Sequence, residues 1–250
     1  METTEKIKNR FGLIGKNISY SFSQGFFTEK FKALGLTDHS YENFDIQSIE
    51  EVTQVFAQPH IKGLNVTIPY KEQIIPYLDE LDPMAEKIGA VNTIKITNNG
   101  LKGFNTDAHG FQKSLEPFLR PHHTKALILG TGGASKAVRF VLEEMGIATT
   151  YVSRNQKKGQ FTYAVLDRHI LAEHTLIINC TALGTSPNIA AKPDIPYQFI
   201  TQNHLLYDLI YNPAKTTFLA LGEKQGATIC NGHQMLVLQA EKAWEIWTMP

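Results

Sequence analysis

The chain has 250 residues, 42% of them hydrophobic, and its 24 basic and 24 acidic side chains give a formal net charge of zero. This length allows one large core or two modest ones, and because neither sign of charge runs in a block, the composition predicts no nucleic-acid or membrane partner. Two cysteines, a polar N-terminus from Met1 to Arg10 and no run of about 18 apolar residues predict a soluble cytoplasmic protein that binds small molecules.

In the first hundred residues, short apolar runs typical of strands alternate with apolar residues at helical spacing. The runs predict strands at residues 11–15, 41–46, 63–68 and 93–96. The helical spacing occurs at Phe26, Phe27, Phe31 and Leu34, and again at Ile49, Val52, Val55 and Phe56. This alternation predicts an α/β fold.

The second part of the chain repeats the scheme with clearer signals. An apolar strand at 126–129, a helical stretch through Leu142 and a strand at 149–152 predict a βαβ unit. Further strands are predicted at 175–179, 205–209 and 228–229. The last predicted helix, 233–247, carries an apolar stripe for core packing, formed by Leu236, Ala240, Ala243, Trp244 and Trp247.

A glycine-rich turn follows the strand at 126–129 and reads Gly130-Thr131-Gly132-Gly133-Ala134-Ser135. Glycines let the chain turn tightly and let its backbone approach a pyrophosphate, which the N–H groups of the following helix would hold. Because Ser135 stands where the G-x-G-x-x-G pattern has its third glycine, an ordinary strand-to-helix connection is the alternative.

The residues after the next strand bear on the choice of dinucleotide. NAD enzymes usually carry an Asp or Glu there, whereas this chain has Ser153-Arg154-Asn155. The Arg154 guanidinium can form forked hydrogen bonds with a 2′-phosphate, so the sequence predicts NADP rather than NAD. The alternative is a solvated surface arginine.

The segment Asn65-Val66-Thr67-Ile68-Pro69-Tyr70-Lys71 combines alternating polar residues with a proline. Period two places Asn65 and Thr67 on one face of the predicted strand. Pro69 cannot extend a central strand, so Lys71 is expected at a strand's end, where functional groups tend to lie. A solvated lysine is the alternative.

Further polar side chains suit a small polyhydroxylated substrate. Asn92-Thr93 and Asn105-Thr106-Asp107 each follow small or apolar residues, and Asp107 precedes a helical pattern, so an N-cap is its alternative role. Ser21 and Ser23 lie just before a predicted helix and can bind a carboxylate, or Ser23 can cap that helix.

Other chemistries lack their motifs in the sequence. The nine histidines are scattered, no H-E-x-x-H or C-x-x-C occurs, and Cys230-x-x-His233 lacks partners, so no metal centre is predicted. The G-x-S-x-G elbow and the G-x-x-x-x-G-K-[ST] loop are also missing, which argues against the commonest α/β hydrolases and kinases.

The chain strongly resembles the shikimate dehydrogenase family. The resemblance rests on motifs in matching order over nearly the whole chain, namely Ser21-x-Ser23, Asn65-Val66-Thr67-x-Pro69-x-Lys71, Gly89-Ala90-Val91-Asn92-Thr93, Asn105-Thr106-Asp107, Gly130-x-Gly132-Gly133-Ala134-Ser135 and Asn231-Gly232-x-x-Met235-Leu236-x-x-Gln239-Ala240.

This resemblance implies a two-domain α/β fold and an activity. Residues 1–105, with 232–250 returning to them as a C-terminal helix, would form an α/β substrate domain, and 106–231 a Rossmann-like, doubly wound NADP domain. The implied reaction is the reversible NADPH-dependent reduction of 3-dehydroshikimate to shikimate, which serves aromatic amino-acid biosynthesis. Lys71 would be the general acid/base and Asp107 would orient it and the substrate hydroxyl.

The resemblance also implies roles for other residues. The substrate carboxylate would bind Ser21, Ser23 and Tyr211, and its hydroxyls Asn65, Thr67, Asn92 and Gln239. The cofactor would contact Gly130, Gly132, Gly133, Ala134, Ser153, Arg154 and Asn155, and also Gly232 beside the nicotinamide. Thr181 and Leu209 are further cofactor candidates, with ordinary turn and core roles as their alternative.

The chain departs from the family at a few positions and leaves alternatives open. Tyr20 and Gln24 replace the usual His and Pro around the serines, Asn155 replaces a common threonine, and the short stretch 155–175 is expected to lack a helix or strand. The alternatives are a quinate or quinate/shikimate dehydrogenase that uses NAD, and a non-catalytic ligand-binding relative. Monomer and homodimer are both compatible with the sequence.

Overall fold

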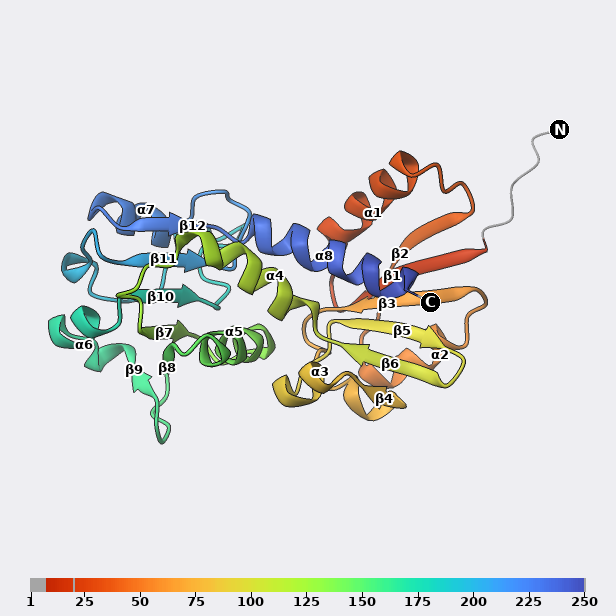
Figure 1. Cartoon of the computed structure of the whole chain (residues 1–250), viewed down its shortest axis with the longest axis horizontal. Coiled ribbons are helices and arrows are strands. Elements are labelled where there is room, and N and C mark those ends of the chain that lie inside the picture. The colour runs from red at the N-terminus through yellow and green to blue at the C-terminus, as the bar shows by residue number, and fades with distance from the viewer. Residues whose placement is uncertain (1–7, 20, 250) are drawn as a thin grey trace. The chain divides into compact units, whose positions relative to one another are not determined.

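The computed structural model describes residues 8–19 and 21–249, and its ribbon is drawn in Figure 1. The chain divides into two compact units, Met1–Thr106 with Ala240–Pro250, and Asp107–Gln239. Each unit contains one six-stranded sheet. The assignment of substrate to the first unit and of cofactor to the second stays a prediction at this point.

The first unit has a mixed sheet with strand order β2-β1-β3-β5-β6-β4. Its strands are β1 (Asn9–Gly15), β2 (His39–Asp45), β3 (Ile61–Val66), β4 (Glu80–Leu81), β5 (Thr93–Thr97) and β6 (Gly100–Phe104). Its helices are α1 (Phe22–Ala33), α2 (Val52–Phe56), α3 (Pro83–Ile88) and the C-terminal part of α8 (His233–Thr248). All four strands predicted here are confirmed, whereas β4 and β6 were not predicted.

An aromatic cluster on one face of this sheet includes the C-terminal helix. Phe27 is fully buried and its ring centroid lies 5.2 Å from that of Trp247. Trp247 donates an indole hydrogen bond to the Ile94 carbonyl (2.9 Å), and its ring covers Gly63, where any side chain would collide with it. The predicted core role of the α8 stripe is therefore confirmed, since Ala240 and Ala243 are also fully buried.

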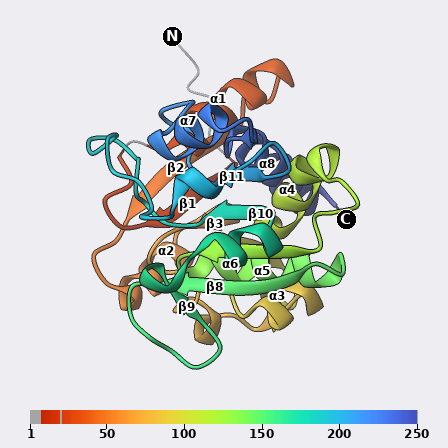
Figure 2. The ribbon, with the colours of Figure 1, turned by 90° about the vertical axis from the view of Figure 1, so that its left-hand side faces the viewer.

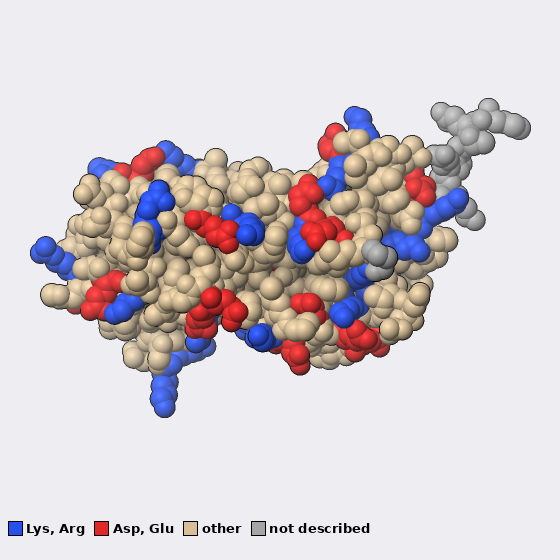
Figure 3. Space-filling view, viewed as in Figure 1, with Lys and Arg blue, Asp and Glu red and all other residues tan. Residues whose placement is uncertain are grey.

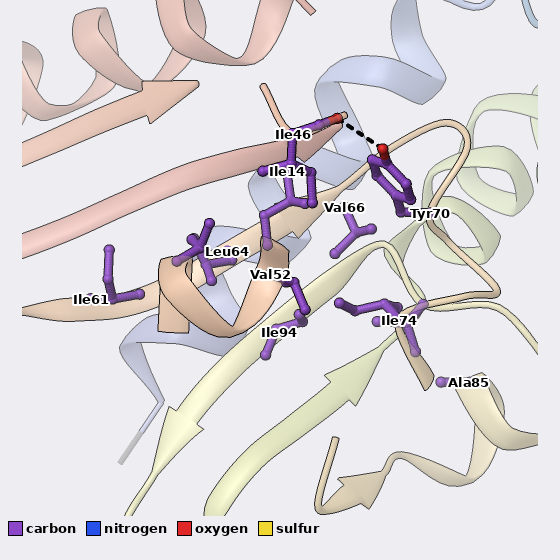
Figure 4. Packing of buried hydrophobic residues seen from close by; sticks show 12 residues of the cluster. Ile14, Ile46, Val52, Ile61, Leu64, Val66, Tyr70, Ile74, Ala85 and Ile94 are labelled. Atoms are coloured by element: carbon purple, nitrogen blue, oxygen red, sulfur yellow. Dashed lines mark hydrogen bonds between the residues drawn. The ribbon is translucent and has the colours of Figure 1, made fainter. Parts of the chain in front are cut away.

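The opposite face of the sheet has an aliphatic cluster, part of which is drawn in Figure 4. Ile14 of β1 and both Leu64 and Val66 of β3 lie in this cluster, whereas Leu13 of β1 belongs to the aromatic one. The change of face from one residue to the next is the period-two alternation of a strand. The central strands of the first unit are therefore covered on both faces.

The second unit has a fully parallel sheet with strand order β12-β11-β10-β7-β8-β9. Its strands are β7 (Lys125–Leu129), β8 (Ala148–Ser153), β9 (Phe161–Thr162), β10 (Leu176–Asn179), β11 (Leu205–Asp208) and β12 (Thr228–Cys230). Its helices are α4 (Thr106–Leu115), α5 (Gly133–Glu144), α6 (Arg168–Glu173) and α7 (Thr217–Lys224). The predicted doubly wound, Rossmann-like fold is confirmed, and its switch point lies between β7 and β10.

Helices cover both faces of this parallel sheet, which Figure 2 shows from a second direction. Leu127 and Leu206 pack in one cluster with Phe218 of α7. On the other face, the Tyr207 ring centroid lies 5.1 Å from that of Phe111 in α4. Burial on both faces explains the apolar runs at 126–129 in β7 and at 176–178 in β10.

The stretch between Asn155 and Thr175, which was expected to lack a helix or strand, contains one of each. It contains the two-residue strand β9, which pairs with β8 at the edge of the sheet, and the short helix α6. Asp167 caps α6, because its carboxylate accepts a hydrogen bond from the Ile170 N–H (2.8 Å). The stretch therefore contains both a strand and a helix.

Charged side chains of both signs are interspersed on the face drawn in Figure 3. Ion pairs in the described part of the chain include Arg10 with Glu42 (2.7 Å) and Lys125 with Glu173 (2.7 Å). Within the described residues, no helix combines the length and the apolar composition that a membrane span requires.

Two buried histidines of the second unit are expected to make protein stability depend on pH. The Nδ1 atom of His123 accepts a hydrogen bond from the Arg120 N–H (3.0 Å), and that of His204 accepts one from the Thr201 N–H (3.1 Å). Burial lowers the pKa of both rings below the usual 6.5, and neighbouring cationic groups, chiefly His122, lower it further.

We therefore expect the free energy of unfolding to be greatest above about pH 6.5 and to fall as the pH is lowered below that value, because the unfolded chain then binds more protons than the folded one. Urea unfolding at pH 7.5 and pH 5.5 measures this loss. The loss should be smaller in His204→Asn than in the exposed control His169→Asn, and an equal loss in both would contradict the assignment.

Candidate functional site

The backbone on either side of Lys71 is held firmly by the first unit. The Tyr70 side chain is buried, and its hydroxyl donates a hydrogen bond to the Ile46 carbonyl (2.8 Å; Figure 4). The Lys71 carbonyl accepts a hydrogen bond from the Val91 N–H (2.8 Å). The strand predicted to reach Ile68 in fact ends at Val66, so Lys71 follows a strand end, and its side chain is half-buried.

Buried hydrogen bonds fix the side chain of Asn65. Its Oδ1 atom accepts a hydrogen bond from the Tyr41 hydroxyl (2.7 Å), and its Nδ2 atom donates to Thr93 Oγ1 (3.2 Å) and to the Asn92 carbonyl (3.3 Å). These bonds leave one Oδ1 lone pair for a ligand. A role in orienting its neighbours is therefore well supported, while its contact with a substrate hydroxyl stays a prediction, as does that of half-buried Thr67.

Asn92 connects this network to the start of α4. Its Oδ1 atom accepts hydrogen bonds from the Thr106 N–H (2.7 Å) and the Thr93 hydroxyl (3.1 Å), and its Nδ2 atom donates to Thr106 Oγ1 (2.9 Å). Thr106 is the first residue of α4 and directly precedes Asp107. Asp107, which is 6% exposed, therefore lies inside the first helical turn and is not the N-cap that the sequence left as an alternative.

The serine motif lies at the start of α1. Ser21 is the N-cap, because its hydroxyl oxygen accepts a hydrogen bond from the Ser23 N–H (3.1 Å), so the suggestion that Ser23 caps the helix is wrong. Ser23 is buried, and its side chain opposes the rise in the pKa of Tyr41 that burial causes. Of the two family departures here, Tyr20 lies outside the described residues, whereas exposed Gln24 accepts a hydrogen bond from Asn43 (3.3 Å).

In the second unit, the glycine-rich turn has the geometry that a pyrophosphate site needs. Gly130 has a φ of +100°, and a Cβ atom on it would lie 3.0 Å from the Thr181 methyl group. Gly132 is the N-cap of α5, no side chain caps the helix there, and open space lies beside its Cα atom. Gly133 and Ala134 then form the first turn, whose N–H groups can hold an anion.

Ser135 replaces the third glycine of the pattern without disturbing this turn. It is 1% exposed, and its hydroxyl donates a hydrogen bond to the Gly132 carbonyl (2.6 Å). The side chain is therefore folded against its own helix and does not extend toward the anion position. The residues present fit a dinucleotide pyrophosphate.

The segment predicted to read the 2′-phosphate directly follows β8. Arg154 is exposed, and the Ser153 hydroxyl donates a hydrogen bond to the Asn155 carbonyl (2.6 Å), which closes the turn around the arginine. Burial raises the pKa of Tyr163, while the nearby Arg154 charge opposes that rise. A positive charge is therefore present at the carboxyl end of β8, as the NADP prediction requires.

Three further cofactor candidates lie at strand ends of the same sheet. Thr181 is held by Asn179, whose Oδ1 accepts from the Thr181 N–H (3.0 Å) and hydroxyl (2.7 Å). Gly232 packs so closely on the Leu209 carbonyl that no larger residue fits. These contacts bring Leu209 and Gly232 together.

The remaining predicted substrate residues of this unit are Tyr211 and Gln239. Tyr211 follows β11 and is half-buried. Gln239 is 9% exposed, and its Nε2 atom donates a hydrogen bond to the Leu236 carbonyl (2.9 Å) within α8. The predicted contacts of both residues with a substrate stay predictions.

Sequence reasoning missed two buried residues that support these segments, Tyr41 and Asp208, and it named Thr93 and Thr106 only as members of polar motifs, without this supporting role. Asp208 had a usable signal, because a carboxylate ending an apolar parallel strand lies where ligands bind in such folds. The other three lie inside Asn-Thr pairs or a strand, and only the fold reveals that they meet.

Neither metal nor thiolate chemistry is supported by the described residues. Among them, no group of three or more His, Cys, Asp or Glu side chains is arranged to hold a metal ion. Burial raises the pKa of the Cys180 thiol far above its usual value and that of Cys230 to about 11, so neither is ionised at neutral pH.

Comparison with known proteins identifies relatives over nearly the whole chain. The sequence profile of the shikimate dehydrogenase substrate binding domain matches residues 13–94. The chain is 36% identical to the shikimate dehydrogenase (NADP(+)) of Desulforamulus reducens and 38% identical to that of Halothermothrix orenii. Each alignment covers 95% of this chain, and 89% and 90% of the respective relative.

A solved structure supports the same relationship. The shikimate 5-dehydrogenase of Thermus thermophilus, crystallised in complex with NADP(H) and shikimate, superposes with a TM-score of 0.84 at 31% identity. The superposition covers 96% of this chain and 93% of that one. The similarity therefore extends through both units.

Proposed function

Because this chain belongs to the shikimate dehydrogenase family, we propose that it catalyses the reversible NADPH-dependent reduction of 3-dehydroshikimate to shikimate, a step of aromatic amino-acid biosynthesis. The observation that carries the proposal is that the Asn65–Lys71 segment and the Gly130 turn occur in one chain that aligns with named relatives over 95% of its length. The first supplies groups for a hydroxylated substrate and the second an anion site for a dinucleotide.

In this proposal Lys71 is the proton donor. Its ammonium group gives a proton to the carbonyl oxygen as the ketone is reduced, and in the reverse direction its amine takes the proton of the substrate hydroxyl. Asp107 orients Lys71 and the same hydroxyl. The Tyr70 anchor and the Asn92–Thr106 bonds support this assignment, because they fix the backbone that carries each group.

The other polar residues would recognise the substrate. Its carboxylate would be bound by hydroxyl groups, those of Ser21, Ser23 and Tyr211. Its ring hydroxyls would be bound by side chains that both donate and accept hydrogen bonds, those of Asn65, Thr67, Asn92 and Gln239. Uncharged groups of this kind discriminate well between hydroxylated ligands, because a missing partner leaves a buried polar group unpaired.

NADPH supplies the hydride. The proposal assigns its pyrophosphate to the N-terminus of α5, with Gly130, Gly132, Gly133 and Ala134 close to it. Ser153, Arg154 and Asn155 would surround the 2′-phosphate, and Thr181, Leu209 and Gly232 would line the nicotinamide side. We further propose that the enzyme acts in the cytoplasm as a monomer or a homodimer.

Initial rates at the nicotinamide absorbance band test this function. Purified protein is offered shikimate and quinate in turn, each with NADP and with NAD. Fast turnover of shikimate with NADP alone is expected. Turnover of quinate or with NAD would support the broader dehydrogenase instead, and no turnover in any of the four mixtures would support a non-catalytic ligand-binding protein.

Tyr41→Phe should weaken substrate binding selectively. The substitution leaves the Asn65 Oδ1 atom without its buried hydrogen-bond donor, and such a loss corresponds to about a tenfold change in an equilibrium constant. We therefore expect the KM for shikimate to rise about tenfold while the KM for NADP is unchanged.

Steady-state kinetics of both substrates measure this effect. Tyr77→Phe is the matched control, because Tyr77 is a half-buried tyrosine of the first unit outside the polar network. A rise in both KM values, or the same rise in the control, would contradict a role for Tyr41 in orienting the substrate site.

A further inference from the structure

A buried carboxylate connects two strand ends of the second unit. Asp208, the last residue of β11, is fully buried. Its Oδ1 atom accepts hydrogen bonds from Asn179 Nδ2 (3.0 Å) and the Ile210 N–H (3.0 Å), and its Oδ2 atom accepts one from the Thr216 hydroxyl (2.6 Å). All three donors are uncharged.

These donors belong to different segments at the carboxyl end of the sheet. Asn179 ends β10, the neighbouring parallel strand, and is the register partner of Asp208. Ile210 lies in the turn after β11, and Thr216 caps α7, since its hydroxyl oxygen also accepts from the Leu219 N–H (3.4 Å). One side chain therefore fixes the spacing of two turns and a helix start.

Each turn leads directly to proposed cofactor contacts. The Oδ1 atom of Asn179 holds Thr181 by its N–H and its hydroxyl, and Thr181 in turn lies against Gly130. The Ile210 carbonyl accepts a hydrogen bond from the Gly232 N–H (3.0 Å), beside the close contact of Gly232 with Leu209. Removal of the carboxylate would release both turns at once.

Burial makes ionisation of the Asp208 carboxyl group unfavourable. Burial raises the pKa of Asp208 to about 6, although its three hydrogen bonds oppose the rise. Since this pKa lies above that of the unfolded chain, ionisation at neutral pH stabilises the unfolded chain more than the folded protein. The three hydrogen bonds partly offset this cost and hold the carboxylate in place.

We propose that Asp208 is a positioning residue of the dinucleotide site, whose carboxylate holds the turns after β10 and β11 at the spacing that NADP(H) binding requires. The inference rests on the proposed function, because it takes these turns to be the cofactor-binding ones. Asp208 acts through Asn179 and Ile210 and need not touch the cofactor itself.

Two substitutions separate the hydrogen bonds from the charge. Asp208→Asn keeps an Oδ1 acceptor for Asn179 and Ile210, and its new amide can donate to Thr216 Oγ1. Asp208→Ala removes every acceptor. Tyr207→Phe is the matched control, because Tyr207 is the neighbouring buried residue of β11 and loses one hydrogen bond, that with Ser114 (2.6 Å), on the other face of the sheet.

The measurement is the dissociation constant of NADPH from nicotinamide fluorescence, without substrate and well below the melting temperature of each variant. We expect Asp208→Ala to raise this constant at least about tenfold, and Asp208→Asn and Tyr207→Phe to leave it within about threefold of the original value. In steady-state kinetics, Asp208→Ala should raise the KM for NADP but not that for shikimate.

An effect of Asp208→Ala no larger than that of Tyr207→Phe, or an equal rise of both KM values, would overturn the proposal. If Asp208→Ala does not fold, Asn179→Ala takes its place, because it removes the hydrogen bond between Asn179 and Asp208 by deleting the donor. The titration needs no turnover, so an unaltered protein that binds NADPH without oxidising shikimate would refute the proposed function while still testing Asp208.

Discussion

Lys71→Ala should lower kcat for shikimate oxidation by about 10²–10⁴-fold, the usual contribution of a general acid/base, and should change the KM for shikimate much less. The reason is that proton transfer occurs in the transition state, so the interaction with Lys71 strengthens there relative to the bound substrate. Steady-state kinetics with shikimate and NADP measure both constants.

Two further variants make this test specific. Lys62→Ala is the control, since Lys62 is an exposed lysine of β3, the same strand that leads to Lys71. Lys71→Arg keeps the positive charge but holds its proton at every accessible pH, so it should remain nearly as slow as the alanine variant. Full activity in either Lys71 variant would remove Lys71 from the proton-transfer role.

Arg154→Ala should weaken NADPH binding by about 10- to 100-fold and leave NADH binding nearly unchanged. Only NADPH carries the 2′-phosphate that can accept charge-assisted hydrogen bonds from the guanidinium. Fluorescence titration of the two reduced cofactors against the same preparation measures the difference.

Lys158→Ala is the control for this effect, because it removes an exposed positive charge four residues away. It should change the binding free energy of neither cofactor by more than a few tenths of a kcal/mol, as expected for a solvated charge. A parallel loss of NADPH and NADH affinity in Arg154→Ala would mean that Arg154 contributes to something other than phosphate recognition.

The sequence predicts most of the strands because many of them are buried on both faces. In the second unit, residues 126–129 are an uninterrupted apolar run and 205–207 are apolar up to Asp208, and both segments form parallel strands inside the sheet. By contrast, β6 contains two glycines and a lysine, so its strand character comes from pairing with β5, a contact between segments that local patterns do not encode.

The candidate site is predictable in its residue types but not in its supporting bonds. The polar positions Asn65, Asn92 and Asp107 follow from their motifs. The orientation of Asn65, for example, depends on Tyr41, which reaches it from two strands away, and on Thr93 of the adjacent strand. Such partnerships exist only after the sheet has formed, and so the sequence left the role of each amide open between substrate contact and structural support.

The C-terminal helix also affects how the protein is made. Its residues from Ala240 onward belong to the first unit, where Trp247 packs on Phe27 and covers Gly63, yet they are synthesised after the entire second unit. A nascent chain that has not yet reached Ala240 therefore presents the aromatic surface of β1 and α1 uncovered. All strands of the parallel sheet lie within 107–239, so the second unit is completely synthesised before the first unit is. The second unit can therefore fold first, which reverses the usual N-terminal-first order of folding.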